Sequence, residues 1–229
     1  MSAQITGISS MATRGVLAEL VGDYRQRQGV EVLIESVGGV DAAKRVLAGE
    51  AFDVVLLASD AIDRLIAAGT VLSGSKVDWV HSGVAVAVRA GSPHPDISSE
   101  DAVRSAVLAA RNVGYSTGPS GVQLMRLFER WGITETLQHR LVQAPPGVPV
   151  GALVASGEIE LGFQQLSELI HQSGISVVGP LPPAIQINTT FSAGICAGCT
   201  QVAAARALLA FLSSPAAAAA QTHHGMSPT

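Results

Sequence analysis

Short apolar runs alternate with segments of helical periodicity through the first 70 residues of the chain. Runs typical of strands lie at residues 4–9, 30–36 and 52–59, and the last is continuous enough for a strand buried on both faces. Apolar residues at helical spacing lie at residues 11–29, 41–50 and 60–69. The third helix is expected to begin with Asp60 as its N-cap and to stop at Gly69. This alternation predicts a parallel sheet with right-handed crossovers.

A second α/β group begins after the long alternating segment WVHSGVAVAVRAG at residues 79–91. Its expected helices are residues 98–110, 120–132, 147–158 and 166–172, and its expected strands are residues 112–116, 139–144, 159–165 and 174–182. A strand at 187–196 and a helix at 201–215 then return to the first group. The predicted fold is therefore α/β with two lobes, residues 1–82 with 190–229 and residues 83–189. Crossings near residues 80–84 and 184–190 would form a two-segment hinge.

Composition and charge narrow the classes of partner. The net charge is −4, only Lys44 and Lys76 are lysines, and aromatic residues are 4% of the chain. The sequence therefore has no row of basic residues to bind phosphates and few aromatic residues to stack on bases, so we expect no nucleic-acid partner. The apolar stretches are shorter than the roughly 20 residues that span a bilayer, so we expect no membrane insertion. Residues 1–6 alternate like a strand and show no signal peptide, which predicts a cytoplasmic protein, or a periplasmic one if a signal segment was removed.

Cysteines and histidines give little sign of metal or redox chemistry. Cys196 and Cys199 form a lone CAGC, which we interpret as two reduced, buried thiols rather than a redox or metal pair. Of the six histidines, only His81 falls near a predicted cleft loop. His223 and His224 lie near a C-terminus that we expect to be frayed, and they are expected to face solvent. The sequence therefore predicts no metal site and no cofactor.

The stretch GYSTGPSG, residues 114–121, is a turn between a predicted strand and a predicted helix. Such a turn presents free backbone N–H groups, and Ser116, Thr117 and Ser120 add hydroxyls beside Gly121. A nucleotide loop would need Gly-Lys-Ser/Thr after its second glycine, and this turn continues as SGVQ. The turn is therefore predicted to bind a small anion other than a nucleotide phosphate.

Four segments in order carry a family resemblance. AGEAFDVVLLASDAIDRL at 48–65 is followed by GALVASGEIELGFQQLSEL at 151–169, GISVVGPLPPAIQINTTFSAGI at 174–195 and ALLAFLSSPAAAA at 207–219. Together they resemble solute-binding proteins of the type II periplasmic-binding fold, within them the molybdate-binding-like family. The resemblance implies two α/β lobes joined by two crossover strands, with the ligand in a cleft between the lobes.

The resemblance also implies ligand contacts at particular positions. Ser10, with Ser9 beside it, matches a ligand serine of the family. Ser120 and Gly121 match a turn that offers a backbone N–H, and Val148 or Pro149 matches another such position. Pro149 has no N–H, so if it is the aligned residue the contact moves to a neighbour. Thr189, Thr190 or Ser192 could also face the ligand near the hinge.

Two departures from molybdate binders favour a carboxylate-like ligand. Gly38 and Gly39 stand where those proteins have a serine-rich loop, and Gln165, beside Gln164, stands where they tend to have tyrosine. A glutamine both donates and accepts hydrogen bonds, which suits a carboxylate or carboxylic acid better than a fully ionised tetrahedral oxyanion. Molybdate is therefore a doubtful ligand.

The function predicted first is binding of a small carboxylate or oxyanion in the cleft, with a transporter as partner only if the protein is exported. The alternative is a cytosolic isomerase of a small polycarboxylate, because aconitate isomerase resembles this family. That reaction moves a proton between allylic carbons and needs an acid and a base, for which Lys44 and Arg14 are the candidates. A third alternative is a ligand sensor that binds a cytosolic partner.

Overall fold

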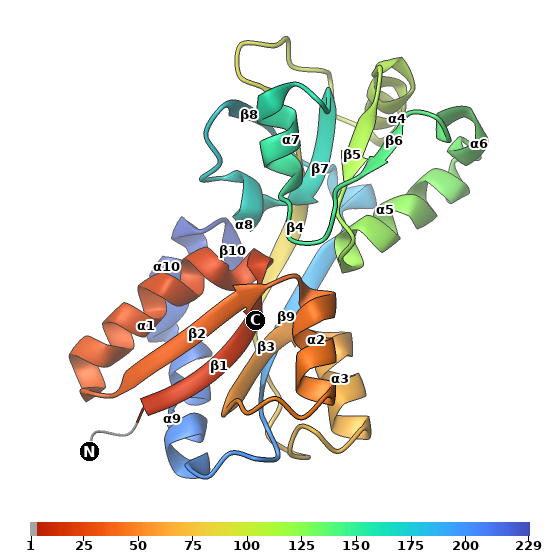
Figure 1. The fold of residues 1–229 in the computed structure, drawn as a ribbon. Coiled ribbons are helices and arrows are strands. Elements are labelled where there is room, and N and C mark those ends of the chain that lie inside the picture. Colours follow the sequence, from red (N-terminus) through yellow and green to blue (C-terminus); the bar gives the residue numbers. More distant parts are fainter. Residues whose placement is uncertain (1–3) are drawn as a thin grey trace. The chain divides into compact units, whose positions relative to one another are not determined.

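The computed structural model describes residues 4–229. The chain divides into two compact units. Unit 1 comprises Met1–Ser82 and Thr189–Thr229, and unit 2 comprises Gly83–Asn188. Each unit is a β-sheet with helices on its faces, so the predicted α/β class is confirmed (Figure 1).

Unit 1 contains the parallel strands that the first third of the sequence predicts. β1 (Gln4–Ser10) lies between β2 (Glu31–Val37) and β3 (Val54–Ala58), and both neighbours run parallel to it. β9 (Asn188–Ile195) returns antiparallel to β3, and β10 (Met226–Pro228) pairs antiparallel with the first half of β4 (Val77–Arg89). The last part of the chain therefore completes the sheet that the first part begins.

Two helical layers cover the sheet of unit 1 (Figure 1). The 3₁₀ turn Met11–Thr13 leads into α1 (Arg14–Gln28), which packs on one face with α9 (Val202–Leu212) and α10 (Ala218–His223). α2 (Gly39–Leu47) and α3 (Ser59–Ala67) cover the other face. All five residues of β3 are buried, as expected for a strand covered on both faces.

Unit 2 is built on the second half of β4. β7 (Leu161–Gln165) and β8 (Ile175–Pro180) pair antiparallel with β4, and β5 (Val113–Tyr115) lies parallel to β7 and to β6 (Leu141–Gln143). Its helices are α4 (Glu100–Ala109), α5 (Pro119–Arg130), α6 (Thr134–Leu137), α7 (Val150–Ser156) and α8 (Leu166–Leu169). Phe128 packs edge-on against Phe163 at a centroid distance of 6.3 Å, which fixes α5 on β7.

Helix boundaries follow the sequence signals in part. α1 ends at Gly29, whose φ of 66° is left-handed and suits glycine, as the stop signal predicts. The prediction that Asp60 caps α3 is wrong, because the helix begins at Ser59 after Ala58 and Asp60 lies in its first turn. The Asp60 carboxylate instead accepts a hydrogen bond of 2.8 Å from Arg64 one turn later. The helix predicted at 166–172 is only the single turn α8.

The frayed C-terminus that the sequence suggested is also wrong. Residues 218–223 form α10, and Met226 pairs with Ser82 in β10. Between residues 4 and 229, no individual helix has the length and apolarity needed to cross a bilayer. Two consecutive helical segments, Val202–Leu212 and Pro215–His223, are together long and apolar enough, but the chain bends between them.

Candidate functional site

The parallel register of unit 1 brings two predicted serines to the carboxyl end of the sheet. Ser9 lies opposite Ser36 in the β1–β2 ladder, and their Oγ atoms are 2.8 Å apart. Ser9 is fully buried, and its hydroxyl also lies 3.4 Å from the Ser10 carbonyl, to which it donates. Ser9 is therefore held by protein groups and supports the turn that presents Ser10.

Ser10 is the residue of this turn with unused hydrogen-bonding capacity. Its Oγ is buried and has no hydrogen-bond partner among residues 4–229, and it does not cap the 3₁₀ turn that follows. A buried hydroxyl left in this state costs about 1–3 kcal/mol. The Gly38–Gly39 turn opens α2 beside it, and a Cβ on Gly39 would stand 3.6 Å from the Ser10 Cβ. Ser10 therefore stays a predicted ligand contact, with a hydroxyl that no described residue uses.

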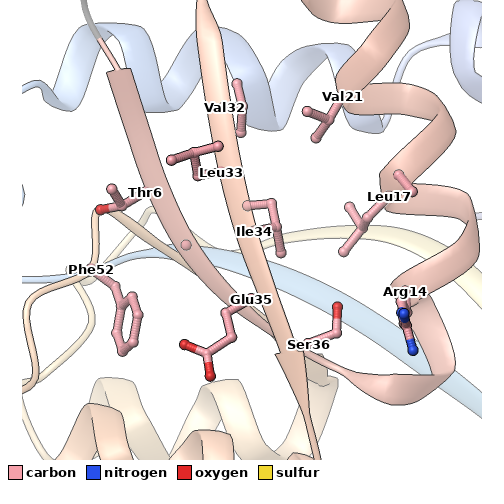
Figure 2. A pocket seen from close by; sticks show the side chains of 12 residues that line it. Thr6, Arg14, Leu17, Val21, Val32, Leu33, Ile34, Glu35, Ser36 and Phe52 are labelled. Carbon is pink, nitrogen blue, oxygen red and sulfur yellow. The ribbon is translucent and has the colours of Figure 1, made fainter.

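The two cationic candidates have different surroundings. The Lys44 side chain is 73% exposed and lies 3.9 Å from Asp41, in the last turn of α2 and away from the Gly39 end. Arg14 begins α1 and lines one end of a groove of about 800 Å³ along β2, where Ser36 lies on the facing strand (Figure 2). The rest of the lining mixes apolar side chains, from Leu17 of α1 to Ile34 of β2, with the carboxylate of Glu35. Of the two cations, Arg14 is therefore better placed to pair with an anion in a groove, and Lys44 faces solvent.

Unit 2 contains the turn GYSTGPSG between β5 and α5. The Oγ atoms of Ser116 and Ser120 are 3.2 Å apart, and Thr117 lies between them in the chain. Gly118 occupies the N-cap position in an extended conformation, and Pro119 begins the helix. A Cβ on Gly121 would stand 1.9 Å from the Ser116 carbonyl oxygen, so the turn closes this tightly only with glycine there. The two hydroxyls therefore lie together at the N-terminus of a 12-residue helix.

Gln164 and Gln165 end β7, and both are buried. Gln164 uses both ends of its amide within the protein, because its Oε1 accepts from the Gly151 N–H at 3.2 Å and its Nε2 donates to Glu168 at 2.8 Å. Gln165 follows on the opposite face of the strand, since side chains alternate along it. Gln164 therefore orients Glu168, and Gln165 stays a predicted ligand contact.

Glu168 is a functional candidate that the sequence reasoning missed. It lies in α8, directly after the carboxyl end of β7. Part of the residue reaches solvent, yet burial of the carboxyl group raises its pKa to about 7, and the hydrogen bond from Gln164 offsets only part of that rise. A carboxyl group that titrates near neutral pH can both accept and donate a proton. The available signal was a carboxylate three residues beyond a pair of glutamines.

Five other predicted positions already take part in the structure of the protein. The Val148 N–H donates to the Pro145 carbonyl at 3.0 Å within a turn, and Pro149 is the N-cap of α7. Thr190 Oγ1 lies 3.0 Å from His81 Nδ1, and Ser192 donates to Asp78 at 2.5 Å. Thr189 is buried next to them in β9. Thr190 and Ser192 therefore link β9 to β4, and the Val148 N–H closes a turn.

The two cysteines lie at the end of β9 as free thiols. Cys196 is buried, as expected, and burial raises its pKa to about 12. Cys199 is half-buried, and burial also raises its pKa. Both groups are therefore protonated at neutral pH, when a reactive cysteine would be a thiolate.

Comparison with known proteins agrees with this fold. The sequence profile of the family described as "Bacterial extracellular solute-binding protein" matches residues 5–227. A protein from Pseudomonas sp. named aconitate isomerase is 40% identical over 230 aligned positions, which cover 98% of this chain and 87% of that protein. The similarity therefore extends over nearly the whole of both chains.

Solved structures show the same fold at low sequence identity. The periplasmic molybdate-binding protein of Azotobacter vinelandii superimposes with a TM-score of 0.80 at 22% identity, over 97% of this chain and 98% of that one. The sulfate-binding protein SubI of Mycobacterium tuberculosis also gives 0.80, at 18% identity, over 99% of this chain and 87% of that one. These likenesses confirm the predicted type II periplasmic-binding-protein-like fold.

Proposed function

This chain belongs to the bacterial extracellular solute-binding protein family, and from that premise we propose that it binds a small polycarboxylate and isomerises it by proton transfer. The observation that carries this proposal is the 40% identity to an aconitate isomerase over nearly the full length of both proteins. The substrate class is therefore an unsaturated tricarboxylate of the aconitate type.

The proposed reaction consumes no co-reactant. One proton leaves the methylene carbon, the double bond moves by one position, and one proton returns to the former vinylic carbon. Glu168 is the proposed proton carrier, because its carboxyl group titrates near pH 7 and Gln164 holds it in place. This assignment replaces Lys44, which is exposed and paired with Asp41.

The remaining polar groups suit the carboxylates of such a substrate. Ser10 in unit 1 and the Ser116–Ser120 pair in unit 2 offer hydroxyls, and the start of α5 adds backbone N–H groups. Arg14 could pair with one carboxylate, since guanidinium groups bind carboxylates through two N–H donors. Each unit therefore offers hydrogen-bond donors that suit a carboxylate.

Calorimetry and NMR test the proposal directly. The purified protein is titrated with cis-aconitate, trans-aconitate, citrate, molybdate and sulfate, and each aconitate isomer is then followed by proton NMR in D₂O. We expect binding of the tricarboxylates, and interconversion of the aconitates with deuterium incorporated at the exchanged carbon. Tight molybdate binding with neither aconitate bound would overturn the substrate class.

Binding without turnover is the second candidate function, and the family description as a solute-binding protein favours it. The two candidates share the ligand and differ only in chemistry. Saturable binding of an aconitate with no conversion of either isomer would establish the binder. Ser10→Ala and Gln165→Leu then test the two predicted contacts separately, since each should weaken binding if its side chain contacts the ligand.

A further inference from the structure

A second cluster of chemically active side chains lies on unit 1, between α1 and the end of α10. Glu19 Oε2 is 3.0 Å from His223 Nδ1 and 2.9 Å from His224 Nε2. One ligand atom from each of the three residues lies within 4.8 Å of the other two. The proposed isomerisation makes no use of these groups.

α1 is shaped to receive the His224 ring. Gly15 and Glu19 are four residues apart and so lie on the same face of the helix, one turn from each other. A Cβ on Gly15 would stand 2.8 Å from His224 Nδ1, so the glycine makes room for the ring. The His224 side chain is consequently only 11% exposed. The expectation that His224 faces solvent is therefore wrong.

The chain on both sides of the histidines is held firmly. Two residues before His223, the buried Gln221 donates from Nε2 to the carbonyls of Trp79 and Leu212, each at 3.0 Å. Two residues after His224, Met226 pairs with Ser82 in β10. The histidines therefore need little reorganisation to act together, and preorganised ligands bind more tightly than mobile ones.

We propose that Glu19, His223 and His224 bind a divalent first-row transition ion of the Zn²⁺ class. Two imidazole nitrogens and one carboxylate oxygen are ligands that such ions prefer, and three protein ligands leave further coordination positions for water. The ion would replace the hydrogen bonds that now join Glu19 to the two rings. His223 is 65% exposed, so the ion can reach the cluster from solvent.

The site also has a structural consequence. Glu19 is in α1 and the histidines end α10, so the ion would link elements about 200 residues apart in the sequence. Binding to the folded state alone raises stability. The site is independent of the proposed isomerisation, so either proposal can fail without the other.

The test uses the whole protein after treatment with a chelator and its removal. Zn²⁺ is titrated by calorimetry, and Co²⁺ is followed by its visible absorption. We expect one ion per chain, and a zinc-dependent rise in the temperature of unfolding. His223→Ala and Glu19→Gln should each weaken binding by at least the roughly 10- to 100-fold that loss of a supporting partner costs, and should abolish the zinc-dependent rise.

Matched controls separate this site from general surface binding. His94→Ala and His139→Ala each remove an exposed histidine outside the cluster and should leave Zn²⁺ affinity unchanged. Far-UV circular dichroism of the metal-free variants checks that each is folded, and His223, being exposed, is the substitution least able to disturb the core. Equal Zn²⁺ affinity in the wild type, His223→Ala and Glu19→Gln would overturn the proposal, as would no stoichiometric binding by the wild type.

Discussion

Gln164 donates a hydrogen bond of 2.8 Å to the carboxyl group of Glu168, while its own carbonyl oxygen accepts from the backbone of Gly151. The amide is thereby fixed in one orientation, with its NH₂ end toward the carboxyl group. Glu168 keeps a second oxygen for other partners, because each carboxyl group has two. An oriented carboxyl with a pKa of about 7 is the feature of unit 2 best suited to proton transfer.

Glu168→Gln is expected to abolish isomerisation while leaving aconitate binding within a few-fold of wild type. The amide keeps the shape and can still accept from Gln164, but it cannot carry a proton. Initial rates by NMR and affinity by calorimetry measure the two effects separately. Glu129→Gln, an exposed carboxyl on α5, is the matched control and should change neither.

The pH profile of the wild type gives an independent check on Glu168. If its carboxylate is the base, kcat/KM should rise as the pH increases through about 7, because the ionised form increases over that range. A profile that is flat between pH 6 and 8, with binding intact, would contradict this assignment.

Stability should also depend on the ionisation of Glu168. The folded-state pKa of about 7 lies above the ordinary value of 4.5 for a glutamate, so the unfolded chain ionises first as the pH rises. Glu168 therefore lowers the free energy of unfolding progressively between about pH 4.5 and 7, by roughly 3 kcal/mol in full. Urea unfolding should show that the free energy of unfolding of Glu168→Gln rises relative to that of the wild type from pH 5 to pH 8. A constant difference between the two proteins would mean that the carboxyl titrates normally.

The Gly121 position should tolerate no side chain. Gly121→Ala would place its Cβ 1.9 Å from the Ser116 carbonyl oxygen and force the turn open. We expect a loss of about 1–3 kcal/mol in the free energy of unfolding, and weaker ligand binding because the Ser116–Ser120 pair moves. Denaturant unfolding and calorimetry measure the two effects.

Gly22→Ala provides the matched control for that substitution. Gly22 lies inside α1, and a Cβ there would meet no described atom within 4 Å. Alanine should stabilise the helix by about 0.5–1 kcal/mol. If both alanine variants behaved alike, the tight closure of the GYSTGPSG turn would be in doubt.

The sequence predicts the serine turns well and the proposed proton carrier, Glu168, poorly, for a physical reason. Parallel strands align their carboxyl ends, so the alternation of strands and helices is enough to place Ser10 and Ser120 at such ends. The properties of Glu168 depend on how α8 packs on its surroundings, and burial of one carboxyl group leaves no local pattern. α8 is also a single turn, too short for its periodicity to show which face is buried.

The histidine pair shows the same limit over a longer separation. The sequence around two adjacent histidines near a chain end, taken by itself, indicates an exposed tail. Their environment depends on Gly15 and Glu19, about 200 residues earlier, and on the anchoring of α10 by Gln221. Only the tertiary structure brings these residues together, so the cluster could not be predicted from spacing.

Ser10 and Ser9 should respond in opposite ways to the loss of their hydroxyls. Ser10→Ala removes a buried Oγ that has no partner within residues 4–229, so the free energy of unfolding without ligand should be unchanged or higher. Ser9→Ala breaks the hydrogen bond to Ser36 and should cost about 1 kcal/mol. Ligand affinity should fall more in Ser10→Ala, because that hydroxyl is the one free to contact the ligand. Urea unfolding with and without aconitate measures both quantities, and a Ser10→Ala protein that is destabilised but binds normally would show that Ser10 has a structural role instead.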